Sequence, residues 1–418
     1  MSFIKTPVKG MQEQLPQDMA VREYALRKIK DTYKKFGFTQ ISTPFIEHIE
    51  NLTGKQGGEN EQLIFKILKR GEKLEHAKSV EDMCDSGLRY DLTVPLSRFY
   101  SNNSEILSMP FKALQIGDVF RADRPQKGRF RQFTQCDIDI FGDSSNLAEI
   151  ELISATVNML NELGIKQLKV RVNDREILKG MAQSCNFAED KLDNIYIVLD
   201  KLDKIGLNGV KDSLISLGLD QSDVEKYVEY FANVEQNISC KQFLNQKCQG
   251  AIQDSIIDNL NNIISCVSHI VGEGCEVCFD PTLVRGMSYY TGPIFEIELP
   301  NYHLSVAGGG RYDKMVEKFC GKVTPACGFS IGFERIISII KENNLLPVET
   351  EPKTAVLIAK DVTNEKIEKT IIRANELRKQ GQNVLISPRN NNAKYQKEKL
   401  MELGYNNFVE IFNDKGEL

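Results

Sequence analysis

Residues 111–142, FKALQIGDVFRADRPQKGRFRQFTQCDIDIFG, constrain the fold more than any other stretch, because two strand-like segments flank a charged loop. In the second segment, QFTQCDIDIF, successive side chains alternate between the two faces of a strand. One face carries Phe133, Gln135, Asp137 and Asp139, and the other carries Cys136, Ile138 and Ile140. Because the isoleucine face is the one that enters a core, the opposite face presents amide and carboxylate groups. The stretch predicts two strands of a sheet with a polar face.

The loop between these segments is strongly basic. Its eleven residues, RADRPQKGRFR, hold five basic side chains and one acid. A charge run of this kind is most often a solvated hairpin loop. Here it adjoins the carboxylate face of the following strand. Together the two predict a site in which carboxylates bind the ammonium of a zwitterion and arginines bind a phosphate.

Composition limits the classes of protein that fit. The chain has 418 residues, which predicts two or three domains, and its 41% apolar and 27% charged residues are typical of a folded, soluble protein. The net charge of -5 excludes a basic field over the whole protein, so a nucleic-acid partner requires a local basic patch. The N-terminus lacks the apolar core of a signal peptide, and no segment is apolar enough to span a bilayer. We therefore expect a cytoplasmic protein.

Ten cysteines are scattered along the chain, which is typical of reduced thiols. Four residues have a spacing that resembles a zinc site: Cys266, His269, Cys275 and Cys278. However, NLNNIISCVSHIVGEG predicts a helix that ends at glycine, and CEVCF predicts a strand. Residues three apart on a strand point to opposite faces of the sheet. We therefore expect small buried hydrophobic side chains here and no zinc.

The patterning predicts an α+β protein with an insertion and a small α/β domain at its C-terminal end. The core is expected in two parts, 1–174 and 271–345, separated by a helical insertion over 175–270, where short helical runs alternate with Asn, Gly and Asp breaks. A linker covers 346–354. Strands alternate with helices over 355–418, which indicates a small parallel sheet.

Two more segments contain candidate site residues. In LRYDLTVPLSR, Asp91 and Thr93 share one face of a predicted strand, although an aspartate alone at this place is more often a structural cap. In VAGGGRYDKM, three glycines follow a predicted strand: Gly308, Gly309 and Gly310. They match neither the dinucleotide-binding fingerprint nor a phosphate loop. Bare glycines predict close packing of backbones or close approach of a ligand.

Arginine is placed near glycine in two other segments. In LVRGMSYYTG, Arg285 precedes a glycine, and Tyr289 and Tyr290 supply two flat faces, each with a hydroxyl at its tip. In ACGFSIGFERIISII, a predicted strand turns into an apolar helix with Arg335 in its first turn. An arginine there opposes the helix dipole, so we expect a compensating anion, either an acidic neighbour or a bound phosphate.

Four of these segments, in order, resemble the signatures of histidyl-tRNA synthetases, a class II family: FRADRPQKGRFRQFTQCDID, LVRGMSYYTG, AGGGRYD and GFSIGFER. TPFIE around Pro44 is similar to the first motif of that class, which forms part of a dimer interface. The resemblance runs from about Lys9 to Leu418. It implies a catalytic core built on an antiparallel sheet, ATP with Mg²⁺, L-histidine and tRNA(His) as ligands, and a homodimer.

The resemblance also implies roles for single residues. Arg121 matches the arginine on the ATP α-phosphate, and Arg285 matches the family's second α-phosphate arginine, which also borders histidine. ATP is further contacted by residues that match Asp123 at the adenine amine, Phe133 under the adenine, Arg335 at the γ-phosphate, and Arg129. The histidine α-amine is received by residues that match Asp91, Thr93, Gln135 and Asp139. Tyr289 and Tyr290 match the imidazole pocket, and Gly308, Gly309 and Gly310 match glycines that flank the adenylate.

The sequence departs from the family pattern in two places. RGMSYY stands where RGLDYY is usual, so Ser288 replaces an aspartate, and DKGEL stops short of the usual end of the anticodon-binding domain. Two alternatives therefore stay open. One is a catalytically inactive, histidine-binding regulatory subunit of ATP phosphoribosyltransferase, against which Arg121, Arg285 and Arg335 weigh. The other is a related enzyme that activates a different amino acid.

Overall fold

The computed structural model describes residues 3–53, 62–79, 81–125, 130–235, 238–248, 250, 252–285, 289–346 and 352–418. Two compact units divide the chain. The first comprises Met1–Glu13 and Ala25–Asn343, and the second comprises Gln14–Tyr24 and Asn344–Leu418. Over the described residues, no helix combines the length and the apolar character that crossing a membrane requires.

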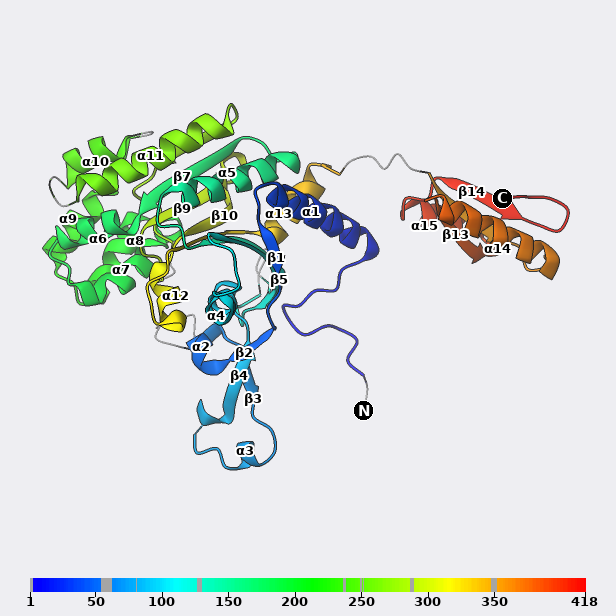
Figure 1. The fold of residues 1–418 in the computed structure, drawn as a ribbon, viewed down its shortest axis with the longest axis horizontal. Helices are drawn as coiled ribbons and strands as arrows, with labels where there is room; N and C mark the ends of the chain where they lie inside the picture. Colours follow the sequence, from blue (N-terminus) through cyan, green and yellow to red (C-terminus); the bar gives the residue numbers. More distant parts are fainter. Residues whose placement is uncertain are drawn as a thin grey trace. The chain divides into compact units, whose positions relative to one another are not determined.

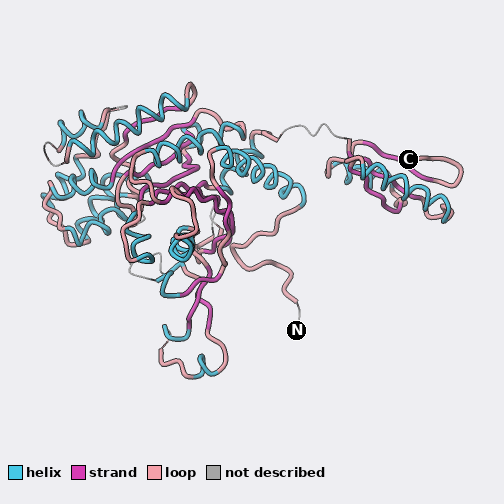
Figure 2. The backbone as a smooth tube through the Cα atoms, viewed as in Figure 1, coloured by secondary structure: helices cyan, strands magenta, loops and turns pink. Residues whose placement is uncertain are grey.

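An eight-stranded sheet forms the centre of the first unit (Figures 1 and 2). Its strands, in spatial order, are β1 (Thr39–Ile41), β5 (Phe111–Phe120), β6 (Gln132–Phe141), β11 (Ala326–Ile331), β10 (Leu304–Arg311), β9 (Pro293–Leu299), β7 (Leu168–Asp174) and β8 (Cys275–Phe279). Neighbouring strands run antiparallel except at the two edges, where β1 pairs with β5 and β7 pairs with β8 in parallel. The predicted α+β core with an antiparallel sheet is confirmed, with these two parallel edges added.

Strands β5 and β6 form the predicted hairpin, in a register that joins Phe111 to Phe141 and Phe120 to Gln132. Ile138 and Ile140 are fully buried, as the alternation predicts. Helix α5 (Leu147–Glu162) packs against β6, β10 and β11, and α13 (Phe333–Glu342) packs against β6 and β10. The apolar face of β6 therefore anchors the strand and fixes the direction of its polar face.

The described chain between β7 and β8 consists mainly of helices joined by turns and short irregular segments. Its helices are α6 (Arg175–Gln183), α7 (Leu192–Leu199), α8 (Leu202–Ser216), α9 (Gln221–Glu229), α10 (Cys240–Lys247) and α11 (Asp254–Val271). Asp174 caps α6 by accepting a hydrogen bond from the Glu176 amide (2.8 Å), and α11 ends at Gly272, whose φ is 69°. Strand β8 follows, as CEVCF predicts.

A smaller antiparallel sheet is formed by β2 (Ile46–His48), β4 (Cys84–Leu88) and β3 (Lys66–Leu68). Further α-helices among the described residues before residue 344 are α1 (Pro16–Lys35), α2 (Ile49–Thr53), α3 (Glu72–Glu75), α4 (Thr93–Asn103) and α12 (Asp313–Cys320). Helix α1 contacts α5 through the Tyr33 hydroxyl, which lies 3.4 Å from Thr156 Oγ1.

Two local predictions are wrong. Asp91 and Thr93 do not lie on a strand, because β4 ends at Leu88 and α4 begins at Thr93. Asp91 accepts a hydrogen bond from the Val94 amide (3.1 Å). This contact stabilises the first turn of α4, so the segment forms a helix although its side chains alternate as in a strand. The glycines of VAGGGRYDKM do not follow a strand but lie inside β10, where bare backbone lets the neighbouring strands and side chains approach.

The second unit contains a three-stranded sheet of order β13-β12-β14, in which β12 (Lys353–Ile358) pairs in parallel with β13 (Asn383–Pro388) and β14 (Asn407–Ile411). Helices α14 (Asn364–Lys379) and α15 (Ala393–Met401) connect the strands. Val356, Ala374 and Ile411 are in its apolar core. The predicted parallel arrangement of strands and helices is confirmed.

Candidate active site

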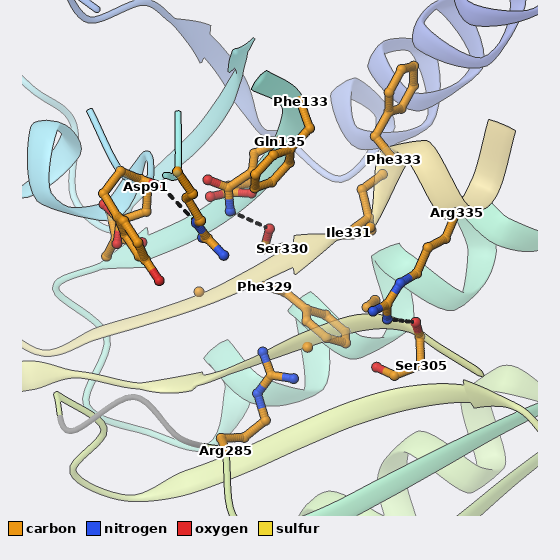
Figure 3. A pocket seen from close by; sticks show the side chains of 18 of the residues that line it. Asp91, Phe133, Gln135, Arg285, Ser305, Phe329, Ser330, Ile331, Phe333 and Arg335 are labelled. Carbon is orange, nitrogen blue, oxygen red and sulfur yellow. Dashed lines mark hydrogen bonds between the residues drawn. The ribbon is translucent and has the colours of Figure 1, made fainter. Parts of the chain in front are cut away.

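A cavity of about 640 Å³ opens beside the polar face of β6. Most of the residues singled out in the sequence line it: Asp91, Thr93, Arg121, Asp123, Phe133, Gln135, Asp139, Arg285, Tyr289, Tyr290, Gly308 and Arg335. Gly309 and Gly310 lie in the same strand as Gly308 but do not line the cavity. Arg129 and Ser288 fall outside the described residues. The structure thus gathers side chains from five separate segments around one space (Figure 3).

One end of the cavity is acidic. Asp91, Asp137 and Asp139 are 5%, 4% and 3% exposed. Burial raises the pKa of Asp91, raises that of Asp139 to about 7, and raises that of Asp137 well above its usual range, with a further contribution from the nearby charge of Asp139. Asp137 Oδ1 and Gln135 Oε1 are buried without a hydrogen-bond partner among the described residues. Buried oxygen atoms that lack a hydrogen-bond donor suit a ligand group that carries a positive charge and N–H donors.

The raised pKa of Asp139 can be tested by substitution. Its pKa is raised from 3.8 to about 7 in the folded chain, so folding favours the protonated carboxyl and the free energy of unfolding falls as pH rises through this range. Asp139→Asn does not ionise, so we expect its free energy of unfolding to rise by about 3 kcal/mol relative to that of the unsubstituted chain between pH 5 and pH 8. The Asn oxygen still accepts the Tyr312 hydroxyl, which donates to Asp139 Oδ1 at 2.5 Å. Denaturant unfolding without ligands measures this, and parallel pH profiles for the two proteins would contradict it.

Arginines surround the rest of the cavity. Arg121 donates from Nε to the Tyr90 carbonyl (3.1 Å), and its guanidinium lies 4.2 Å from the centre of the Tyr90 ring and 5.1 Å from that of Phe133. These contacts fix its direction. Arg335 lies in the first turn of α13, as predicted, and its Nη1 donates to the Ser305 carbonyl. The Arg335 guanidinium therefore has a hydrogen-bond acceptor on β10. This carbonyl is not the anion that we expect to balance the arginine at the start of the helix.

Arg285 lies across the cavity from Asp91 and Gln135 (Figure 3). Its Nη1 donates to Glu296 Oε2 (2.9 Å), while its Nε is buried without a partner among the described residues. Glu296 also accepts from Arg171 through its other oxygen, Oε1 (3.3 Å). The backbone of Arg285 has a φ of 53°, which lies in the left-handed region that residues other than glycine rarely adopt.

The three glycines of β10 serve different neighbours. A methyl group on Gly308 would lie 2.3 Å from the Arg285 Nη1 atom, one on Gly309 would lie 2.0 Å from the carbonyl oxygen of Gly328, and one on Gly310 would lie 2.7 Å from that of Pro293. Gly308 therefore makes room for the arginine, whereas Gly309 and Gly310 make room for adjacent backbone. Gly310 also borders a side chain of the cavity, because its methyl group would lie 3.0 Å from Tyr290 Cδ1.

Some cavity residues were missed in the sequence. Asp137 was on the predicted polar face but was not chosen, although the alternation alone would have included it. Further lining residues lie inside the quoted segments but were not selected, among them Tyr90, Tyr312, Ser330 and Glu334. The tertiary fold adds others from the chain between β7 and β8, among them Asp200, Lys201 and Lys204. Periodicity carries no signal for Asp200, Lys201 and Lys204, because they meet the site only through long-range packing.

Comparisons with known proteins identify the family of the chain. The family model described as "Histidyl-tRNA synthetase" matches residues 10–336. The chain is 44% identical over 367 residues to "Histidine--tRNA ligase" of Leifsonia xyli subsp. xyli (strain CTCB07), covering 84% of this chain and 83% of that protein. A crystal structure of histidyl-tRNA synthetase from Nostoc sp. PCC 7120 is similar, with a TM-score of 0.77, 26% identity, and coverage of 98% of this chain and 92% of the other.

A second solved structure shares the fold. It is described as an ATP phosphoribosyltransferase regulatory subunit/histidyl-tRNA synthetase from Bacillus halodurans C, with a TM-score of 0.75, 21% identity, and coverage of 98% of this chain and 99% of the other. At this identity the likeness concerns the fold alone. The family model covers the described cavity and the sequence relative covers most of the chain, and on both grounds the chain belongs to the histidyl-tRNA synthetase family.

Proposed function

We propose that this chain is a histidine–tRNA ligase, which joins L-histidine to ATP as histidyl-adenylate with release of pyrophosphate and then transfers histidine to the 3' end of tRNA(His). The observation that carries the proposal is the division of one cavity into a buried carboxylate end and an arginine-lined remainder. An amino acid that reacts with a nucleotide needs both, because its ammonium and the phosphates carry opposite charges.

The carboxylate end is proposed to hold the amino acid. Asp91, Gln135 and Asp139 receive the α-amine together with Thr93. Binding an ammonium among these groups supplies the positive charge that the buried carboxyls lack, so the ligand and the ionised carboxylates stabilise each other. Tyr289 and Tyr290, whose ring centres lie 4.7 Å apart, are proposed to border the imidazole.

The arginines are proposed to act on the phosphates. The histidine carboxylate oxygen attacks the α-phosphorus, the bond from that phosphorus to the bridging oxygen of pyrophosphate breaks, and negative charge builds on the five-coordinate centre between these events. Arg121 and Arg285 are proposed to stabilise that charge, because guanidinium groups already held in place need no reorganisation as the charge develops. Arg335 is proposed to bind the γ-phosphate, and Arg129 to add a further contact to ATP.

The nucleotide base and the product are assigned to other residues of the cavity. Phe133 is proposed to stack on adenine and Asp123 to accept from its amine. Gly308, with Gly309 and Gly310 behind it, is proposed to flank the adenylate. In the second step a hydroxyl at the 3' end of tRNA attacks the histidyl carbonyl, and AMP leaves.

Mg²⁺ is proposed to accompany ATP. In nucleotide sites this ion takes most of its ligands from phosphates and water and needs only one or two protein carboxylates. Within the described residues, no group of three or more His, Cys, Asp and Glu side chains is placed to hold a metal. Asp123 and Glu334 line the cavity and supply carboxylates of the required kind. Bound with ATP, the ion would neutralise charge on the β- and γ-phosphates.

The inactive regulatory subunit is not favoured. Relatives over most of the chain are named histidine–tRNA ligases, and Arg121, Arg285 and Arg335 all line the cavity. We further propose a cytoplasmic homodimer, with the first-motif resemblance around Pro44 at its interface. The small parallel sheet after residue 352 is proposed as part of an anticodon-binding domain, and residues 175–270 as a separate helical insertion.

Histidine-dependent exchange of pyrophosphate into ATP tests the first step, with the other amino acids as controls, and charging of total tRNA tests the second. Exchange that depends on histidine alone, followed by charging, is the expected result. Exchange without charging would overturn the second step only. Binding of histidine without any exchange would favour the regulatory subunit, and exchange with another amino acid would replace the proposed substrate.

A further inference from the structure

The segment that carries Arg285 is tied to residues 173–175, where β7 ends and α6 begins. Asn173 Nδ2 donates to the carbonyls of Leu283 (2.9 Å) and Pro281 (3.4 Å). Arg175 Nη2 donates to the carbonyl of Arg285 itself (2.9 Å). The backbone amide of Arg175 donates to the carbonyl of Gly292 (3.0 Å), at the other end of the same loop. A short stretch of the core thus holds both ends of LVRGMSYYTG.

Arg285 needs such support because of its backbone. A φ of 53° places a residue with a side chain in a sparsely populated region, which costs on the order of 1 kcal/mol or more and persists only where surrounding contacts determine it. The hydrogen bond from Arg175 reaches the carbonyl of this strained residue directly. This hydrogen bond therefore helps to fix the backbone conformation of Arg285, and with it the direction in which the Arg285 side chain points.

Arg175 is itself held from the helical insertion. Its side chain is buried at 5% exposure, and its guanidinium lies 4.4 Å from the centre of the Tyr196 ring. Tyr196 belongs to α7 and is 6% exposed. Stacking on a ring fixes the plane of a guanidinium, and with it the direction of its N–H groups. Helix α7 therefore orients Arg175 toward the Arg285 carbonyl.

We infer that Arg175 is a positioning residue for the reaction: it fixes the backbone of Arg285 so that the guanidinium of Arg285 faces the α-phosphate, and it links the helical insertion to that arginine. The inference rests on the proposed role of Arg285. Arg175 is absent from the residues that line the described cavity, so its action on substrates passes through Arg285. Arg175 thereby differs from Arg121, which lines the cavity.

A double-mutant cycle tests the inference, with the single-turnover rate of histidyl-adenylate formation measured for the full chain, Arg175→Met, Arg285→Ala and the double variant. A misplaced catalytic group lowers the rate by about 10-fold to 100-fold, and we expect Arg175→Met to fall in that range while the KM for histidine changes by less than about threefold. In the Arg285→Ala background, Arg175→Met should change the rate by less than about twofold, because the group that it positions is already gone. Equal effects in both backgrounds, or a near-normal rate in the single variant, would overturn the inference.

Further variants separate positioning from loss of the fold. Arg175→Lys keeps one donor for the Arg285 carbonyl and should recover part of the rate, and Tyr196→Leu keeps an apolar side chain under Arg175 and should lower the rate without affecting histidine KM. Arg378→Met is a control for the loss of an arginine that donates to a backbone carbonyl, because Arg378, which is exposed, donates to that of Val384 (2.7 Å) in the second unit. Its adenylate rate should be unchanged. No recovery in Arg175→Lys together with a normal rate in Tyr196→Leu would also overturn the inference. Lack of exchange in the unsubstituted chain would instead contradict the proposed function.

Discussion

Arg285→Ala is expected to lower the single-turnover rate of histidyl-adenylate formation by on the order of 10²-fold or more, as the loss of one fixed donor to a developing negative charge does in other enzymes. Arg285 is suited to that role because its guanidinium is aimed before the substrate arrives. Glu296 holds Nη1, Gly308 leaves room beside the side chain, and Nε is buried without a partner among the described residues. Measurement at saturating ATP and histidine isolates the chemical step, since weak binding of either substrate no longer limits the rate.

The fold should tolerate this change. Glu296 keeps its contact with Arg171 when Arg285 is removed, so no buried carboxylate is left without a cation. Arg285→Lys retains the charge but not the planar fork, and we expect an intermediate rate from it. A near-normal single-turnover rate in Arg285→Ala would remove this arginine from the transition state, and then Arg121 alone would remain as the proposed α-phosphate ligand.

The sequence was sufficient for those parts of the fold and site that depend on local periodicity. The alternation in QFTQCDIDIF predicted strand β6 and the side chains that it turns toward the cavity, and the alternation of strands and helices after residue 352 predicted a parallel sheet. Arg335 was predicted in the first turn of its helix for the same kind of reason. In each case the pattern extends over enough residues to outweigh the secondary-structure preference of any single residue.

The error at Asp91 and Thr93 has a local cause, whereas the omissions have tertiary causes. Thr93 begins a helix because Asp91 caps it, and a capping contact over three residues is too short for a periodic pattern to reveal. The contact between Arg175 and Arg285 joins residues 110 apart in the chain. The lysines of the insertion enter the cavity wall only after α7 and α8 fold over it. Charge patterning along the chain reveals neither the Arg175–Arg285 contact nor the position of these lysines, because both arise from packing between elements.

Gly308→Ala, the second prediction with a large effect, is expected to reduce adenylate formation by about 10-fold to 100-fold with little loss of stability, since displacing a catalytic group by about 1 Å is enough for such a change. The added methyl group would lie 2.3–2.6 Å from three atoms of the Arg285 guanidinium. This group is the far end of a flexible side chain, so it moves away and its contact with Glu296 is disturbed. Gly309→Ala is the contrast: its methyl group would lie 2.0 Å from the Gly328 carbonyl oxygen, which is backbone, so we expect a loss of stability of about 1–3 kcal/mol or more. Denaturant unfolding and single-turnover rates of both variants separate the two effects. In the Arg285→Ala background, Gly308→Ala should have almost no further effect on the rate, and a second full decrease there would show that the methyl group obstructs the substrate itself instead of displacing the arginine.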